Sequence, residues 1–319
     1  MREFLISEND ANQRVDRFLN KACPLLPSSL MYKYIRNKKI KVNKKRCTIS
    51  QRLAAGDSIQ CYIKEEFFSS KEESYDFTGI SPKLTVVYED EHILVAYKPK
   101  DMLVQKDQSG IQDNMNDRLR HYLYVHHAYD PKQEQSFTPA FAHRLDRNTE
   151  GILIAGKTAA ALRCLNEKIK THEIEKYYLA LAEGELKPKE ADLIFYHDKD
   201  MRNNKAVLYR EPSENTKQIH THYRLIQTIG KNSLIEVQLF TGKSHQIRAS
   251  FAMIHHPLIG DKKYGAKQDY DFGNQALCAY KLRFAFKDDC CLSYLKDREI
   301  VLKSGELIDY IRKYRAHRK

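Results

Sequence analysis

The chain has 319 residues, of which 42% are hydrophobic; this length suits two domains, and this share of hydrophobic residues supports a sizeable core. Its 54 lysines and arginines exceed its 42 aspartates and glutamates and give a formal net charge of +12, which favours a polyanionic partner such as nucleic acid or an anionic membrane. Because the sequence has no run of about 18 apolar residues and no apolar segment typical of a signal peptide, we expect a cytoplasmic protein without membrane spans.

Residues 1–64 have the pattern of two short helices followed by short strands, a unit too small to resemble an enzyme. The first predicted helix carries apolar residues at helical spacing: Val15, Phe18, Leu19 and Ala22. Pro24 ends this helix, and Ser28 or Ser29 is predicted to cap the second one. Two strands and two turns are then predicted at residues 40–42, Asn43–Lys44, Gly56–Asp57 and 59–63.

Basic residues concentrate where the second predicted helix meets the strands, with eight cations in fourteen consecutive positions. This basic cluster consists of Lys33, Arg36, Lys38, Lys39, Lys41, Lys44, Lys45 and Arg46. Its density exceeds what a solvated surface of mixed charge normally carries, so we interpret the cluster as a phosphate-binding surface. An ordinary exposed surface is the alternative.

Residues 65–83 lack sustained periodicity and are interpreted as a linker. Beyond them the sequence predicts a hairpin over residues 85–97 and a helix that contains Leu119 and Leu123. Further strands and helices are predicted at residues 152–155, 159–170, 177–182, 222–225, 234–239 and 244–254. This mixture indicates an α+β domain over residues 84–319, built around one large sheet.

The most informative segment is HRLDRNTEGILI, residues 143–154, in which a polar stretch precedes an apolar strand. Asp146 stands between Arg144 and Arg147, and nearby positive charge favours an ionised carboxylate and lowers its pKa. Such a carboxylate can act as a nucleophile. A structural ion pair at the entrance of a strand explains the same segment, and this segment alone does not decide between the two.

Two later segments add candidate site residues. Tyr178 falls on a predicted strand, where it serves either core packing or base stacking. Residues 241–248 open a predicted helix after a glycine turn, where polar side chains form a candidate anion site. The seven cysteines are scattered and contain no CxxC pair, which predicts reduced thiols. We expect no metal site, because no set of ligands has suitable spacing.

In this order, the three segments resemble the RluA family of pseudouridine synthases. The family motif HRLDxxTSGLLL is matched at His143–Asp146, Thr149 and Gly151–Leu153. The motif KxYxAxxxG is matched at Lys176, Tyr178, Ala180 and Gly184. The motifs GRxHQIR and HPxxGDxxYG are matched at Gly242, His245–Arg248, His256, Pro257, Gly260, Asp261, Tyr264 and Gly265. Residues 276–284 are similar to the closing strand of the family.

The segment of residues 1–64 in turn resembles the alpha-L RNA-binding domain, at Arg14–Leu19, Ile40–Asn43, Leu53 and Ala55–Ile59. The two resemblances together imply a small RNA-binding domain (1–64), a linker (65–83) and a pseudouridine synthase domain (84–319). They also imply that the synthase domain is built on a large mixed sheet that is mainly antiparallel.

The resemblance implies a role for each matched site residue. Asp146 would attack the target uridine as the nucleophile, Arg248 would keep it ionised, and Tyr178 would stack on the uracil. Arg144 would fill the gap left by the extruded nucleotide. The further substrate-binding residues would be His143, Thr149, Lys176, Lys243, His245 and Gln246. Because the reaction is an internal rearrangement, we expect no cofactor, and the sequence contains no GxGxxG or GxxxxGK[ST] motif.

The sequence departs from the family pattern at three site positions. Glu150 replaces a serine and adds a negative charge close to Asp146 in the sequence, Lys243 replaces an arginine and loses its bidentate fork, and Cys278 replaces a histidine. The resemblance favours a monomeric enzyme that acts on large-subunit ribosomal RNA, including RNA within pre-ribosomal particles, with transfer RNA as the alternative substrate.

Two other classes of function compete with this interpretation. A non-catalytic RNA-binding or ribosome-assembly factor on the same fold is disfavoured by the retained Asp146, Tyr178 and Arg248. A hydrolase that uses a histidine with Asp146 is disfavoured because no GxSxG-type elbow is present.

Overall fold

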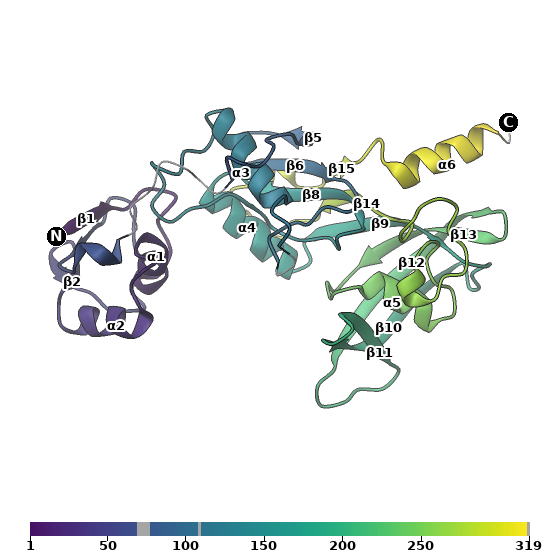
Figure 1. The fold of residues 1–319 in the computed structure, drawn as a ribbon, viewed down its shortest axis with the longest axis horizontal. Helices are drawn as coiled ribbons and strands as arrows, with labels where there is room; N and C mark the ends of the chain where they lie inside the picture. Colours follow the sequence, from purple (N-terminus) through teal and green to yellow (C-terminus); the bar gives the residue numbers. More distant parts are fainter. Residues whose placement is uncertain (69–76, 108–109, 318–319) are drawn as a thin grey trace. The chain divides into compact units, whose positions relative to one another are not determined.

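The computed structural model describes residues 1–68, 77–107 and 110–317, and Figure 1 shows its helices and strands. The chain forms two compact units. The first contains Met1–Lys83, Asn116–Ala140 and Gly156–Arg163, and the second contains Leu84–Met115, Phe141–Ala155 and Cys164–Lys319. The predicted linker falls partly on residues 69–76, which lie outside the described residues.

The first unit contains a four-stranded sheet and two helices that enclose a small core. Its strands are β1 (Arg2–Leu5), β2 (Ile40–Val42), β3 (Lys45–Arg46) and β4 (Ser58–Cys61), in the order β1-β4-β2-β3. The helices α1 (Val15–Ala22) and α2 (Ser28–Arg36) bury their apolar faces because Val15, Phe18 and Met31 pack against Ile59. The short 3-10 helix η1 (Glu65–Phe67) is followed by Phe68, which joins this core.

The N-terminal predictions hold with one correction, and two strands, β3 and β1, were not predicted. Both helices and the strand over residues 40–42 are confirmed. The prediction that Ser28 or Ser29 caps α2 is wrong, since Pro27 is the cap residue and Ser28 is already helical. The strand β1 was not predicted. It contains only four residues and alternates weakly, so its place is fixed by pairing with β4 rather than by its own pattern.

The turn at Asn43–Lys44 is confirmed, and its geometry explains the asparagine. Both residues have left-handed backbone angles, with φ values of 50° and 64°, as two-residue hairpin turns between twisted strands require. Asn43 accepts a hydrogen bond from the Ser58 backbone at 2.8 Å and donates one to Asp57 at 2.7 Å. These bonds hold the hairpin that carries half of the basic cluster.

The second unit is built around an eleven-stranded sheet within the described residues. Its strands are β5 (Thr85–Glu89), β6 (Ile93–Lys98), β7 (Ala140–Phe141), β8 (Glu150–Gly156), β9 (Ile174–Ala182), β10 (Glu190–Asp200), β11 (Lys205–Tyr209), β12 (Lys217–Ile229), β13 (Asn232–Leu239), β14 (Leu277–Phe284) and β15 (Glu299–Val301). The order is β11-β10-β12-β13-β9-β14-β8-β6-β5, with β15 on β14 and β7 on β8. The pair β14–β8 is parallel, and the pairs around it are antiparallel, so the predicted mixed, mainly antiparallel sheet is confirmed.

The helices outside the small N-terminal core are α3 (Met115–Val125), α4 (Ala159–Lys170), α5 (Gln246–Met253) and α6 (Glu306–Ala316). Two further 3-10 helices are η2 (Lys262–Tyr264) and η3 (Ser293–Leu295). In the second unit, α5 packs on β10, β11 and β12, and α6 packs on β9 and β14. Of these elements, α6, η2 and η3 were not predicted. No helix in the described part of the chain has the length and apolar character needed to cross a membrane.

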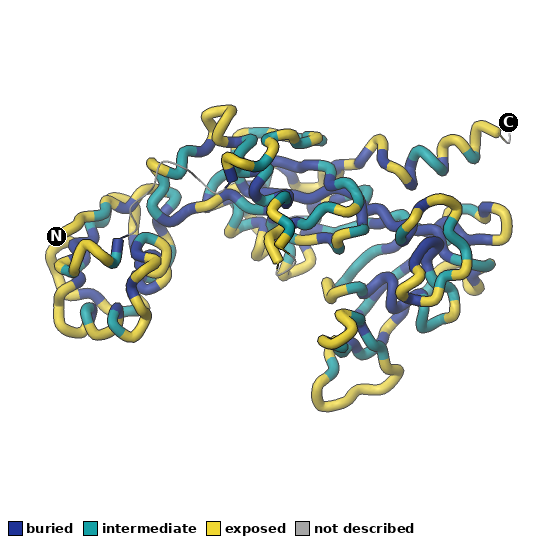
Figure 2. The backbone as a smooth tube through the Cα atoms, viewed as in Figure 1, coloured by how far each residue is buried: buried dark blue, intermediate teal, exposed yellow. Residues whose placement is uncertain are grey.

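The centre of the sheet is buried, and one glycine permits its packing. Every residue of β8 is buried, as the dark segment in Figure 2 shows. Gly151 has a φ of +131°, and a Cβ at this position would lie 2.3 Å from the carbonyl oxygen of Ala279 on β14. Only glycine fits this close approach, which sets the start of β8 and therefore the loop immediately before it.

Candidate active site

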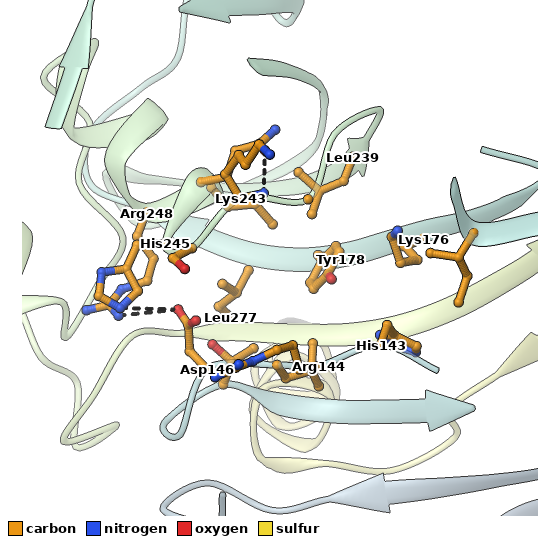
Figure 3. Close-up of a pocket in the computed structure, with 17 residues that line it drawn as sticks. His143, Arg144, Asp146, Lys176, Tyr178, Leu239, Lys243, His245, Arg248 and Leu277 are labelled. Carbon is orange, nitrogen blue, oxygen red and sulfur yellow. Dashed lines mark hydrogen bonds and ion pairs between the residues drawn. The ribbon is translucent and has the colours of Figure 1, made fainter. Parts of the chain in front are cut away.

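An open pocket of about 340 Å³ lies on one face of the large sheet. It brings together the three sequence motifs, as Figure 3 shows. Its lining consists of His143, Arg144, Leu145, Asp146, Thr149, Ile169, Lys176, Tyr178, Leu239, Gly242, Lys243, Ser244, His245, Gln246, Ile247, Arg248 and Leu277. All ten residues predicted to be catalytic or substrate-binding are among them.

Asp146 lies in the loop between β7 and β8, at the first position of a turn. The Thr149 backbone N–H donates to the Asp146 carbonyl at 3.0 Å and closes this turn. The ammonium of Lys98, at the end of β6, donates to the carbonyl oxygens of Pro99, Met102 and Arg147 at 2.8, 2.9 and 2.8 Å. Burial lowers the pKa of Lys98 to about 7. The hydrogen bond from the buried Lys98 to Arg147 thus helps to fix the loop that carries Asp146.

Arg248 joins the candidate nucleophile to a buried carboxylate. Its Nε and Nη2 atoms donate to Oδ2 and Oδ1 of Asp261, both at 2.7 Å. Its Nη1 atom lies 3.4 Å from Oδ2 of Asp146. Burial opposes the charge of Arg248, but the hydrogen bonds and charge of Asp261 outweigh it and raise the pKa of the guanidinium. The cation is therefore permanent, and it faces Asp146 in a fixed orientation.

Tyr178 and Lys176 project from β9 on the same face because they are two positions apart. In Figure 3, Tyr178 lies between the Asp146 end of the pocket and the end that holds Lys176 and His143. Burial, and then the charge of Asp146, raise the pKa of Tyr178, so its phenol stays neutral. A neutral aromatic ring in a wall of the pocket can stack on a base.

His143 is a neutral, half-buried imidazole in the lining of the pocket. Burial lowers its pKa to about 3, and the charge of Lys176 acts in the same direction. Its Nε2 atom accepts the Ile154 backbone N–H at 3.3 Å, which places the ring proton on Nδ1. This Nδ1 is buried and has no hydrogen-bond partner among the described residues. The interaction with β8 explains why a histidine stands at this position.

Two residues that were predicted to contact the substrate, Gln246 and Thr149, use their polar side-chain groups in hydrogen bonds within the protein. The Gln246 amide bonds Thr241 and Lys243 through its oxygen, and the His220 carbonyl and Thr221 through its nitrogen. The Thr149 hydroxyl accepts from Gln275 at 3.0 Å. Both side chains therefore hold the loops of the pocket. Arg144 and Lys243, in contrast, are exposed and are free to reach a ligand.

The structure gives Glu150 a role other than the expected one beside Asp146. Its carboxylate accepts the Tyr97 hydroxyl at 2.6 Å and the backbone N–H groups of Glu306 and Leu307 at 2.9 and 2.8 Å. These amides begin α6, so Glu150 satisfies a helix N-terminus. Cys278, another departure from the family pattern, is buried in β14, and burial raises the pKa of its thiol.

The basic cluster lies on consecutive segments of the first unit, from the last turn of α2 through β2 and β3. Seven of its eight residues are exposed and Lys41 is half-buried. Lys39 lies over the Tyr34 ring at 5.4 Å, and Lys41 lies over the Tyr62 ring at 5.3 Å. Cations interleaved with aromatic rings are typical of surfaces that bind nucleic acid.

Sequence reasoning did not assign roles to Lys98, Asp261 and Tyr264. A lysine at the end of an apolar strand, directly before Pro99, was a weak signal for a buried cation. Asp261 and Tyr264 stood inside a recognised motif, but their contacts with Arg248 (for Tyr264, a cation over the ring at 5.1 Å) depend on the fold. Among the described residues, no group of three or more His, Cys, Asp or Glu side chains is placed to hold a metal ion.

The arrangement can supply a carboxylate nucleophile beside a permanent cation, with an aromatic wall and exposed cations at the open mouth of the pocket.

Comparisons with known proteins agree with this interpretation of the pocket. The profile of a family described as RNA pseudouridylate synthase matches residues 92–253. A solved human protein, RNA Pseudouridylate Synthase Domain Containing 4, has a similar fold, with a TM-score of 0.56 at 20% identity over 72% of this chain and 92% of that one.

Relatives extend over most of the chain. An uncharacterized RNA pseudouridine synthase of Mycoplasma genitalium is 32% identical over 290 residues, covering 88% of each chain. The Ribosomal large subunit pseudouridine synthase C of Buchnera aphidicola is 32% identical and covers 85% of this chain and 83% of its own. The protein of the same name from Escherichia coli is 30% identical and covers 82% and 79%.

Proposed function

Because this chain belongs to the RNA pseudouridylate synthase family, whose members are isomerases that act on RNA, we propose that it converts specific uridines of large-subunit ribosomal RNA to pseudouridine with Asp146 as the nucleophile. One observation carries the proposal: the Asp146 carboxylate faces the Arg248 guanidinium at 3.4 Å in an open pocket. A nearby cation favours the ionised, nucleophilic form of a carboxylate.

The proposed reaction needs the uridine outside the RNA helix. Extrusion of a base from the stack costs a few kcal/mol, and Arg144 at the mouth of the pocket is suited to fill the gap it leaves. Tyr178 would stack on the uracil, at about 1–3 kcal/mol per base. The Asp146 carboxylate forms a bond to C1′ as the N1–C1′ bond breaks. The base then turns, and a C5–C1′ bond forms as the bond from Asp146 to C1′ breaks, while a proton leaves C5 and one is gained at N1. The product is an isomer, so the reaction requires no redox partner.

Two features support ribosomal RNA as the substrate class. Relatives that cover most of this chain are named for the large ribosomal subunit. The basic cluster supplies a second, exposed surface for phosphates outside the pocket. We assign it to an RNA-binding domain over residues 1–64, followed by a linker over 65–83 and a catalytic domain over 84–319. An RNA substrate larger than a single stem-loop would use both surfaces.

A tritium-release assay tests the function and the nucleophile together. The purified chain should release tritium from uridine labelled at C5 in a large-subunit ribosomal RNA transcript. Asp146→Asn keeps the size of the side chain and removes its charge, so release should fall by at least about 10³-fold, the scale of losing an essential catalytic group. RNA binding, measured by filter retention, should persist.

The control is Asp269→Asn, which removes a half-buried carboxylate outside the pocket that pairs with Lys262, and it should leave release unchanged. Turnover retained in Asp146→Asn would contradict the assignment of the nucleophile. Release from a transfer RNA transcript, with none from ribosomal RNA, would contradict the assignment of the substrate and leave the chemistry intact.

A further inference from the structure

The two oxygens of the Asp146 carboxylate have different surroundings. Arg248 Nη1 lies 3.4 Å from Oδ2, and His245 Nε2 lies 3.9 Å from the same Oδ2. No described residue forms a hydrogen bond or ion pair with Oδ1. Two nitrogen groups from one segment of chain thus converge on a single oxygen, and the other oxygen faces the pocket without a protein partner.

The backbone conformation at His245 determines where its side chain lies. The residue adopts a left-handed conformation with a φ of 54°, directly before α5. A non-glycine residue in this region carries strain of about 1–3 kcal/mol, which the surrounding structure offsets. The Ala249 N–H donates to the His245 carbonyl at 2.9 Å, and Gln246 anchors the loop before it. The imidazole is thereby directed toward the side of the pocket that holds Asp146 (Figure 3).

Tyr264 determines which nitrogen of His245 carries the proton. Its hydroxyl accepts the Ala206 backbone N–H at 2.8 Å and lies 3.0 Å from Nδ1 of His245. A second acceptor, the Ala206 carbonyl, is farther away at 3.4 Å, so the phenol proton is best donated to Nδ1. Burial raises the pKa of Tyr264 to about 12, which keeps this proton in place.

The imidazole therefore has only one site left for its own proton. Burial lowers the pKa of His245, an effect that Asp146 opposes and Arg248 and Lys263 reinforce. A neutral imidazole whose Nδ1 accepts must carry its hydrogen on Nε2. The atom Nε2 that carries this hydrogen is the ring nitrogen that lies near Oδ2 of Asp146. A separation of 3.9 Å is long for a hydrogen bond, but contacts of this kind tighten when substrate closes a site.

We propose that Tyr264 and His245 form a positioning pair for Asp146: the Tyr264 hydroxyl fixes the proton of His245 on Nε2, and this N–H, with Arg248, holds Oδ2 so that Oδ1 is the attacking atom. The inference rests on the proposed function of Asp146. His245 acts through the carboxylate and Tyr264 acts through His245, so neither is assigned a bond to the substrate.

Two amide substitutions of His245 distinguish the roles of its two ring nitrogens, because Gln and Asn each place an amide nitrogen near a different one. In His245→Gln, the amide nitrogen falls near the place of Nε2 and donates without any choice of tautomer. In His245→Asn, it falls near Nδ1 and does not reach Asp146. We expect His245→Asn to lower kcat about tenfold or more with KM nearly unchanged, because a small misplacement of a reacting group has effects of this scale. His245→Gln should retain most of the activity.

Tyr264→Phe keeps the ring over Arg248 and removes only the hydroxyl. It should lower kcat several-fold in the natural chain but have no further effect in the His245→Gln background, since coupled residues are not additive. The matched control is Tyr310→Phe on α6, whose ring packs on Phe272 and lies outside the pocket. This control substitution should leave kcat and KM unchanged.

The readout is kcat and KM for tritium release from the C5-labelled ribosomal RNA transcript, with melting temperatures to exclude unfolding. Equal losses in His245→Asn and His245→Gln, or a full Tyr264→Phe effect in the His245→Gln background, would overturn the positioning pair while release by the natural chain upholds the proposed function. Absence of release from the natural chain would overturn the proposed function and this inference with it.

Discussion

The basic cluster and the pocket wall both present cations, but the protein holds these cations in opposite ways. Seven of the eight cluster residues are exposed, and none of the eight forms an ion pair with a described carboxylate. Arg248 exposes only 9% of its side chain and has its orientation fixed by both oxygens of Asp261. Exposed, unpaired cations gain affinity from released counterions and lose it with salt, whereas a buried and oriented cation gives direction and is weakly screened. We therefore expect the basic cluster to contribute to RNA binding and Arg248 to contribute to the chemical step.

Neutralising the basic cluster should sharpen this division and gives the largest expected effect on binding. Replacing Lys38, Lys39, Lys44 and Lys45 with glutamine removes four candidate phosphate contacts. Since each contact contributes about 0.7 to the slope of log affinity against log salt for single strands, the slope should flatten by about 3 and affinity near physiological salt should fall about 10²-fold. Filter binding at four salt concentrations measures both.

The matched control removes four exposed lysines from the other unit: Lys187, Lys231, Lys296 and Lys303. It alters the net charge equally. If both quadruple variants flatten the slope to the same extent, net charge rather than the basic cluster drives docking. If kcat at saturating RNA falls in the cluster variant, the separation of docking from chemistry is incorrect.

The pocket cation should show the reverse behaviour. Asp261→Asn leaves Arg248 without its buried counter-charge and frees it to turn. We expect kcat to fall about 10–100-fold, as when a catalytic group is displaced by about 1 Å, while the salt slope of RNA binding stays the same. Removal of one partner from a buried ion pair also destabilises a protein by about 3–5 kcal/mol. Single-turnover rates must therefore be measured well below the melting temperature of the variant.

Glu150 gives the smallest expected effect on activity. Glu150→Gln replaces an acceptor of two α6 amides with a group that carries one acceptor and one donor. Loss of hydrogen bonds to a charged group costs about 1–3 kcal/mol, which urea denaturation should detect. The rate should stay within about twofold, since the carboxylate serves α6 rather than the nucleophile. A large change in kcat at unchanged stability would show that Glu150 influences Asp146 after all.

Much of the fold and of the candidate site could be predicted from the sequence. The features that could not be predicted depend on contacts between distant segments. Periodicity located α1, α2 and the strands that flank the pocket, because their apolar faces must be buried. The pocket residues were found because three motifs carry recognisable chemistry. The pairing of Arg248 with Asp146 was predicted, but its pairing with Asp261 was not, because that contact depends on how α5 and the segment before η2 meet. The role of Glu150 depended on α6, 156 positions away.

Pseudouridine mapping tests the central claim most directly. Total RNA is compared from cells with the natural gene, with the gene deleted, and with the Asp146→Asn allele expressed at the same level. We predict that one or more pseudouridines of large-subunit ribosomal RNA disappear on deletion and that the Asp146→Asn allele fails to restore them. Restoration by that allele, or an unchanged map after deletion, would contradict the account.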